Sequence, residues 1–255
     1  LSAWGRVADY REYQLSQKPN VETYLESSLN VDQVLEFGFE NVCIATGSSW
    51  RADGVSRQHV VPILNDNSIN LYTPDDIMND KLPTGKVVIY DDDHYYMGGV
   101  IAEKLIEKGC DVTLLTPCAY VSEWSINTLE QAEIQKRLIE MGVKIELNRG
   151  LISISNSKLI SNCIYTQNEK EIETQNIVMV ASRKPHDQLY NDLLLKRTEW
   201  IDAGIKSVKL IGDANAPGPI AWATYAGHRY ARELDTKEIG DTLPFRREIT
   251  NLSIN

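Results

Sequence analysis

The sequence is 255 residues long, with 42% hydrophobic and 24% charged residues, an ordinary composition for one large or two small globular domains. Its net charge of -10 argues against nucleic-acid binding, because phosphate contacts need clustered lysine and arginine. No apolar run approaches the ~20 residues that span a bilayer and no export signal opens the chain, so we expect no membrane partner and a cytoplasmic location. The four cysteines form no Cys-x-x-Cys pair, so we expect no metal site in this chain.

The first third of the chain predicts short elements joined by loops. In chain order these elements are a strand over 20–27, a helix over 31–37, a buried strand over 41–47 and a helix over 74–78. Asn30 is the expected N-cap of the first helix. Asp, Asn, Ser and Pro dominate residues 48–83, a composition that is typical of a connector.

From Lys86 onward, apolar strand patterns alternate with amphipathic helix patterns. The expected strands lie over 87–90, 111–116, 143–147, 151–155, 159–166, 177–181 and 208–213. The expected helices lie over 98–108, 127–141, 186–195 and 220–234. This order is a βαβ unit followed by antiparallel strands, so the sequence predicts an α/β fold.

The loop between the strand at 87–90 and the helix at Gly98 is the usual position of a dinucleotide fingerprint. Glycines there let the backbone approach a pyrophosphate, which the helix N-terminus attracts. Here residues 91–93 are three aspartates, and residues 116–117 provide neither the acid nor the arginine that would bind a ribose. Both features oppose NAD(P) binding. The aspartates can hold a cation, but we favour the simpler interpretation that they cap the following helix.

Two further strand ends form a candidate ligand site. The residues concerned are Ala45, Thr46, Gly47, Gly212, Asp213 and Ala214. Each apolar strand ends in a small-residue turn that lets a ligand approach the backbone, and Asp213 would accept a hydrogen bond from a ligand hydroxyl. The helix from Ile220 would point its N-terminal amides at the same place. Neither turn alone is specific evidence for a ligand site, but the two turns in this order, on either side of a βαβ insertion, are specific evidence. No nucleophile elbow is present, so we expect no catalytic residues.

At these residues the chain resembles the C-terminal region of the trimethylamine dehydrogenase family, which includes dimethylamine dehydrogenase, histamine dehydrogenase and N-methyl amino acid demethylases. The stretches that carry the resemblance run in order along the chain: Trp4, 9–12, 44–47, Trp50, 53–54, 95–97, 102–105, 128–130, 211–214, 216–217, 220–221 and 227–229. The run 91–99 is most similar to that of the demethylases that act on N-methylated amino acids or betaine-derived amines.

The resemblance implies two Rossmann-like domains of the FAD/NAD(P)-binding type, one inserted in the other. Residues 1–83 and 190–255 would form an N-terminally truncated FAD- or ADP-binding-like domain, and residues 84–189 an inserted NAD(P)-binding-like domain. In the parent enzyme, an N-terminal (β/α)8 barrel would hold FMN, a 4Fe-4S cluster and the amine. Leu1 would begin after that barrel and after the glycine-rich turn that binds the nucleotide's pyrophosphate.

We therefore expect a fragment of a flavin-dependent amine dehydrogenase or N-demethylase that is inactive alone and keeps half of a FAD or ADP site. Its expected partners are the missing barrel, an electron-transferring flavoprotein and, in the full enzyme, further copies of itself. The helix from Asn127, with Gln131 and Glu133, is the candidate electron-partner surface. Two alternatives stay open: a fragment of an NAD(P)H-dependent flavoenzyme like dienoyl-CoA reductase, and a split, non-catalytic subunit that docks a barrel from another chain.

Overall fold

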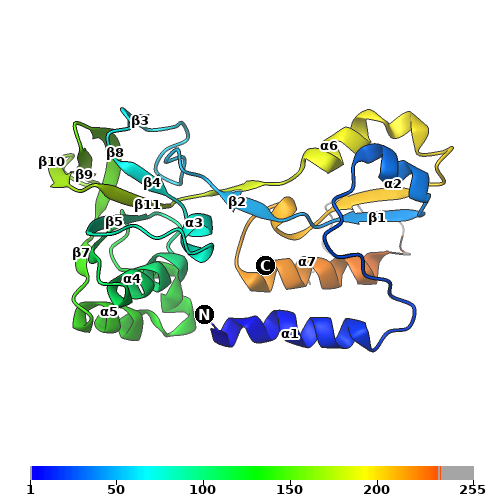
Figure 1. Cartoon of the computed structure of the whole chain (residues 1–255), viewed down its shortest axis with the longest axis horizontal. Helices are drawn as coiled ribbons and strands as arrows, with labels where there is room; N and C mark the ends of the chain where they lie inside the picture. Colours follow the sequence, from blue (N-terminus) through cyan, green and yellow to red (C-terminus); the bar gives the residue numbers. More distant parts are fainter. Residues whose placement is uncertain (1, 235, 237–255) are drawn as a thin grey trace, which may run out of the picture.

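The computed structural model of the protein describes residues 2–234 and 236, and it has two parts arranged along its long axis (Figure 1). We call residues 51–182 the larger part, and residues 2–47 with 186–234 the smaller part. Two short antiparallel strands, β2 (Ser48–Trp50) and β12 (Arg183–Pro185), carry the chain from the smaller part to the larger part and back.

The larger part is built on a five-stranded parallel sheet in the order β4-β11-β5-β6-β7. Its strands are β4 (Asn70–Tyr72), β5 (Lys86–Asp91), β6 (Asp111–Leu115), β7 (Lys144–Glu146) and β11 (Asn176–Val180). β11 is buried at all five positions and β5 at every position after Lys86. Such continuous apolar burial is typical of parallel strands that are covered on both faces.

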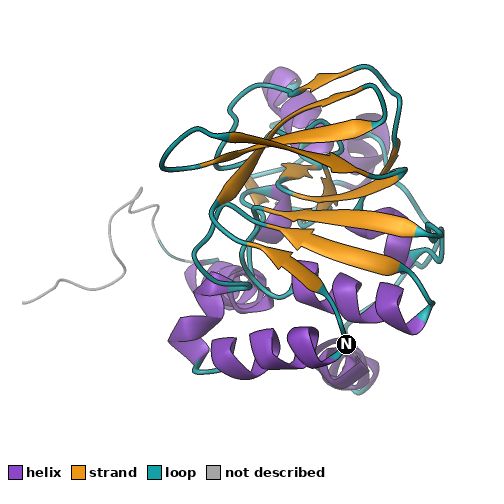
Figure 2. Cartoon of the chain, turned by 90° about the vertical axis from the view of Figure 1, so that its left-hand side faces the viewer, coloured by secondary structure: helices purple, strands orange, loops and turns teal. Residues whose placement is uncertain are grey.

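Helices cover one face of this sheet and a second sheet covers the other (Figure 2). The helices are α3 (Pro74–Met78), α4 (Met97–Glu107) and α5 (Gln131–Glu140), and the second sheet contains β3 (Leu64–Asn65), β8 (Arg149–Ser155), β9 (Lys158–Cys163) and β10 (Glu169–Glu173). Along β5, Val87 and Ile89 pack on the helices, while Val88 and Tyr90 pack on the second sheet. The two-residue period of a strand thus produces two hydrophobic cores from one apolar run.

The smaller part contains a two-stranded parallel sheet, β1 (Asn41–Ile44) beside β13 (Ser207–Leu210). Its helical elements are α1 (Ser2–Ser16), α2 (Val31–Phe37), α6 (Gln188–Leu195), η2 (Arg197–Glu199), η3 (Gly212–Ala214) and α7 (Ile220–Glu233). Its core is a small cluster around Ile44, Leu193 and Trp200. No residue of α7 is buried, and Trp222 on that helix is 53% exposed.

Most of the predicted elements are confirmed. α2 begins with a capping box between Asn30 and Gln33, and α3 has the predicted bounds. The strand predicted over 20–27 is wrong, because those residues form turns and loop. The single helix predicted over 127–141 is also wrong: it is divided into η1 (Glu123–Thr128) and α5, because Leu129 between them adopts the left-handed conformation with φ 63°.

Residues 64–78 lie with the larger part, although the sequence pattern indicated a connector. β4 pairs in parallel with β11, β3 pairs in parallel with β8, and α3 contributes the fully buried Ile77 to the core beneath the sheet. Strands of two or three residues carry too little periodicity to be distinguished from loop in the sequence. This segment therefore supplies one edge strand to each sheet of the larger part.

Candidate functional site

The acidic loop at the carboxyl end of β5 contains an internal ion pair. Asp92 is fully buried, and its Oδ1 lies 2.9 Å from Nη2 of Arg57. Arg57 Nε also donates to the carbonyl oxygen of Asp92 at 2.8 Å, and the Gln58 N–H donates to the second carboxylate oxygen at 2.9 Å. Arg57 Nη2 further donates to Sγ of Cys118, 3.1 Å away, beyond the end of β6. The segment around Arg57 thus reaches over the carboxyl ends of two neighbouring strands.

Asp91 and Asp93 flank this ion pair. Asp91 Oδ1 accepts the backbone N–H of His94 at 3.1 Å, and its Oδ2 is buried and contacts no donor among the described residues. Burial, followed by the charge of Asp93, raises the pKa of Asp91 to about 7. Burial also raises the pKa of Asp93 to about 6, although Arg183 and Arg57 oppose the rise. The loop therefore holds two acids that titrate near neutral pH.

The expectation that these aspartates cap α4 is wrong. The N-cap residue is Tyr96, it makes no side-chain cap hydrogen bond, and the first turn contains no acid. Instead the Asp91 side chain lies against Gly98, where an added Cβ would stand 2.3 Å from Oδ2. A protein carboxylate thus occupies the space in front of the helix where related folds bind a pyrophosphate. In the described part of the chain, no group of three or more His, Cys, Asp or Glu side chains could hold a metal ion.

The two turns predicted to form a ligand site lie side by side. β1 and β13 are parallel neighbours with Ile44 opposite Leu210, so both turns leave the same edge of the sheet. Gly47 and Gly212 have φ values of 79° and 59°, which favour glycine. A Cβ added to Gly47 would meet nothing within 4 Å, so the space on that side of the residue is free.

The six predicted residues differ in their exposure. Ala45 and Thr46 are exposed, Gly47, Gly212 and Asp213 are half-buried, and Ala214 is fully buried in the interior. The hydroxyl of Thr46 donates to the carbonyl of His186, and the His186 N–H donates to the carbonyl of Gly47 at 2.9 Å. The carbonyls of Gly47 and Gly212 both accept backbone N–H groups, so the turns offer a ligand mainly the free space beside Gly47, where a side chain would otherwise stand.

Asp213 has partners within the chain. Its Oδ2 lies 2.8 Å from Nη1 of Arg183 and accepts Ser48 Oγ at 3.2 Å. Its Oδ1 accepts the N–H of Gly218 at 3.2 Å, just before α7. Sequence reasoning missed Arg183, Ser48 and Arg57, because each meets its acid across 30 or more residues. Such pairs leave no local pattern.

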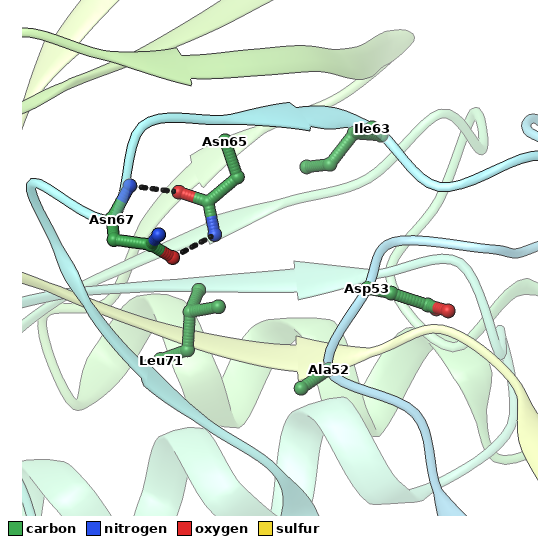
Figure 3. A pocket seen from close by; sticks show the side chains of 6 residues that line it. All are labelled: Ala52, Asp53, Ile63, Asn65, Asn67 and Leu71. Atoms are coloured by element: carbon green, nitrogen blue, oxygen red, sulfur yellow. Dashed lines mark hydrogen bonds between the residues drawn. The ribbon is translucent and has the colours of Figure 1, made fainter.

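Two further surfaces lie away from these turns, a hollow on the larger part and the exposed face of α5. A hollow of about 350 Å³ opens elsewhere on the larger part, and its lining residues are Ala52, Asp53, Ile63, Asn65, Asn67 and Leu71 (Figure 3). It shares no residue with the predicted site, and its two asparagines bond to each other. On α5, Gln131 is half-buried and donates to Val121 and Gln135, whereas Glu133 is exposed. None of the described helices combines the length and apolar character that crossing a membrane requires.

Comparison with known proteins gives consistent results. A family model of the OYE-like second alpha/beta domain matches residues 72–177. The chain is 31% identical over 274 residues to dimethylamine dehydrogenase of Hyphomicrobium sp. (strain x), covering 97% of this chain and 37% of that protein.

Solved structures agree. Histamine dehydrogenase from Rhizobium sp. 4-9 superposes with a TM-score of 0.95 at 59% identity, covering all of this chain and 40% of its own. The 6-hydroxypseudooxynicotine amine oxidase from Pseudomonas geniculata N1 has a TM-score of 0.87 at 39% identity, covering 92% of this chain and 35% of its own. The chain spans about two fifths or less of the length of these relatives. The chain thus resembles the C-terminal region of trimethylamine dehydrogenase-like proteins, with which all of these matches are consistent.

Proposed function

We propose that this chain is the nucleotide-binding-like, electron-transfer-associated region of a flavin-dependent amine dehydrogenase or N-demethylase. The observation that carries the proposal is the structural match to histamine dehydrogenase, which covers the whole of this chain with a TM-score of 0.95. Amine oxidation, with FMN and a 4Fe-4S cluster, would take place in a barrel outside these 255 residues. The chain alone would then have no amine-oxidising activity, and the resemblance supports a cytoplasmic enzyme with an electron-transferring flavoprotein and further copies of itself as partners.

The ligand that we propose for the smaller part is FAD or ADP. The adjacent turns at Gly47 and Gly212, with free space beside Gly47, support this assignment. Thr46, Gly47 and Gly212 would contact the nucleotide, and Asp213 would hold the turn through its bonds to Ser48 and Gly218. Bound FAD would supply a second redox centre, and bound ADP would supply none.

We propose that the larger part does not bind NAD(P). The Asp91 carboxylate against Gly98 and the Arg57–Asp92 ion pair support this proposal, because they place protein groups where the pyrophosphate would lie. They argue against the alternative of an NAD(P)H-dependent reductase of the dienoyl-CoA type. Strand pairing by residues 64–72 also supports an inserted domain that begins soon after Trp50, earlier than residue 84, and ends near Ser182.

The decisive experiment is cofactor analysis of the native protein, purified from its natural gene. We expect an adenine nucleotide among the extracted cofactors, reduction of the flavin by a methylated amine or histamine, and no saturable NADH binding by calorimetry. Tight NADH binding together with no amine-dependent flavin reduction would sink the proposal. The mass of the native gene product separates a longer enzyme from a split subunit.

A further inference from the structure

Arg183 lies where the connecting strands meet the turn of the smaller part. In the β2–β12 pairing it is opposite Trp50, and its guanidinium stands 5.1 Å from the centre of the Trp50 ring. The Trp50 N–H donates to Oδ2 of Asp75, on α3, at 2.8 Å. Arg183 is therefore held by a ring and a strand that are themselves bound to the larger part.

Asp213 stands at the other side of this contact. Its carboxylate joins three segments of the chain: Arg183 on β12, Ser48 at the start of β2, and the Gly218 amide before α7. The side chains of Arg183 and Asp213 are 17% and 25% exposed, so water screens their attraction only partly. One half-buried carboxylate thus fixes the Gly212 turn relative to both connecting strands.

We propose that the Arg183–Asp213 ion pair is a latch: it fixes the Gly47 and Gly212 turns on the connecting strands, so that nucleotide binding in the smaller part depends on an arginine held by the larger part. The nucleotide aspect rests on the proposed function. The latch itself rests on the geometry alone. Arg183 is a positioning residue here, because the guanidinium bonds to Asp213 and acts on the site through it.

The latch predicts a coupling between the two parts. Few segments connect them, and parts joined in this way move relative to one another unless specific contacts hold them. Without Arg183, the Asp213 carboxylate loses its charged partner while keeping its half-buried position. We expect the turns at 45–48 and 212–218 to open more often, and the nucleotide site to be preformed less often.

The test uses the native protein with its cofactors and the variants Arg183→Gln, Asp213→Asn and R183Q/D213N. Hydrogen exchange is followed at residues 45–48 and 212–218, and ADP affinity is measured after removal of the bound nucleotide. Arg51→Gln is the matched control. Arg51 follows Trp50, the residue opposite Arg183, and it also pairs with an aspartate, Asp53 at 2.6 Å. That pair does not touch the Gly212 turn.

We expect Arg183→Gln to raise exchange at both turns and to weaken ADP binding about tenfold, with Arg51→Gln within about twofold of the native protein. The double variant R183Q/D213N should bind ADP no more weakly than the poorer of the two single variants. Unchanged exchange at the turns in Arg183→Gln, or equal exchange in Arg183→Gln and Arg51→Gln, overturns the latch. If the native protein binds no adenine nucleotide, the proposed function fails and exchange alone decides the latch.

Discussion

The carboxylate of Asp91 lies directly against Gly98, at the start of α4. A Cβ built on Gly98 would stand 2.3 Å from Asp91 Oδ2 and 2.5 Å from its Cγ. Real Cβ atoms do not come this close to a carboxylate, and Asp91 is fully buried at the end of a central strand and cannot swing away. The two residues therefore depend on each other: the acid can be buried there because residue 98 has no side chain.

Gly98→Ala should consequently destabilise the protein by about 2–3 kcal/mol, a typical cost of overpacking. The measurement is the free energy of unfolding from urea denaturation. Gly99→Ala is the control, because its Cβ would lie 3.6–3.7 Å from Ile134, Ser122 and Leu138, which is ordinary packing distance. We expect Gly99→Ala to be neutral or slightly stabilising. The double variant D91A/G98A should regain most of the loss, and a Gly98→Ala protein as stable as Gly99→Ala would contradict the contact.

Asp91 should also make stability depend on pH. Its pKa is raised to about 7 in the folded protein, so folding favours the protonated form. The stability that this group contributes is complete at pH values below the unfolded pKa near 3.9 and is lost as the pH rises through about 7. The difference between the two pKa values corresponds to about 4 kcal/mol. Asp93, with its pKa raised to about 6, acts in the same direction.

Asp91→Asn cannot ionise, so its stability relative to the native protein should rise by ~2–4 kcal/mol from pH 4 to pH 8. Thermal melts across this range in one buffer system measure it. Asp66→Asn is the control, because the pKa of Asp66 is lowered by hydrogen bonds from Ser68 and Asn156. Its replacement should not reproduce the gain at high pH. A constant stability difference between Asp91→Asn and the native protein would show that Asp91 is already ionised when folded.

The sequence predicted those helices and strands whose stabilising residues lie within or next to the element itself. α2 was predicted with its N-cap because Asn30 lies next to it in sequence, and β5 and β11 were predicted because parallel strands covered on both faces are continuous apolar runs. The neighbouring positions of the Gly47 and Gly212 turns followed from the rule that parallel strands end at one edge.

Contacts between distant segments could not be predicted in this way. Arg57 reaches Asp92 from 35 residues away, and its loop carries no pattern that marks the acid as its partner. The cap assigned to residues 91–93 was wrong because the sequence places them before α4 but does not show that Asp91 turns inward against Gly98. These tertiary contacts determine the chemistry of the candidate sites.

The Arg57–Asp92 ion pair gives a third prediction. Asp92 is fully buried, so removing its partner leaves an uncompensated charge, which typically costs 3–5 kcal/mol. Because the Arg57 side chain is 46% exposed and water can partly replace it, we expect Arg57→Gln to cost about 2 kcal/mol. Urea denaturation at pH 7 measures this loss.

Arg137→Gln is the control for this pair. Arg137 lies 2.8 Å from Glu103, a similar distance, but both side chains are more accessible than Asp92, so the loss should stay below about 1 kcal/mol. The double variant R57Q/D92N should be more stable than Arg57→Gln, because it no longer buries a lone charge. Equal losses for Arg57→Gln and Arg137→Gln would mean that the buried position of Asp92 does not matter.

The break in the predicted helix around Leu129 gives the last prediction. Leu129 has φ 63° and is 91% exposed, so its side chain packs on almost nothing while its backbone adopts a conformation that disfavours branched residues. Thr128 and Glu130 on either side form a hydrogen-bonded group with the Tyr96 hydroxyl, which holds the backbone in this bend. Leu129→Gly should therefore raise the unfolding free energy by ~0.5–1 kcal/mol.

Leu195→Gly is the control. Leu195 is the last residue of α6, so it is helical, and it is similarly accessible at 85% exposed. Its replacement by glycine should lower the unfolding free energy by about as much. Thermal melts of both variants decide the matter: if both glycines destabilise alike, the left-handed bend is not imposed on residue 129.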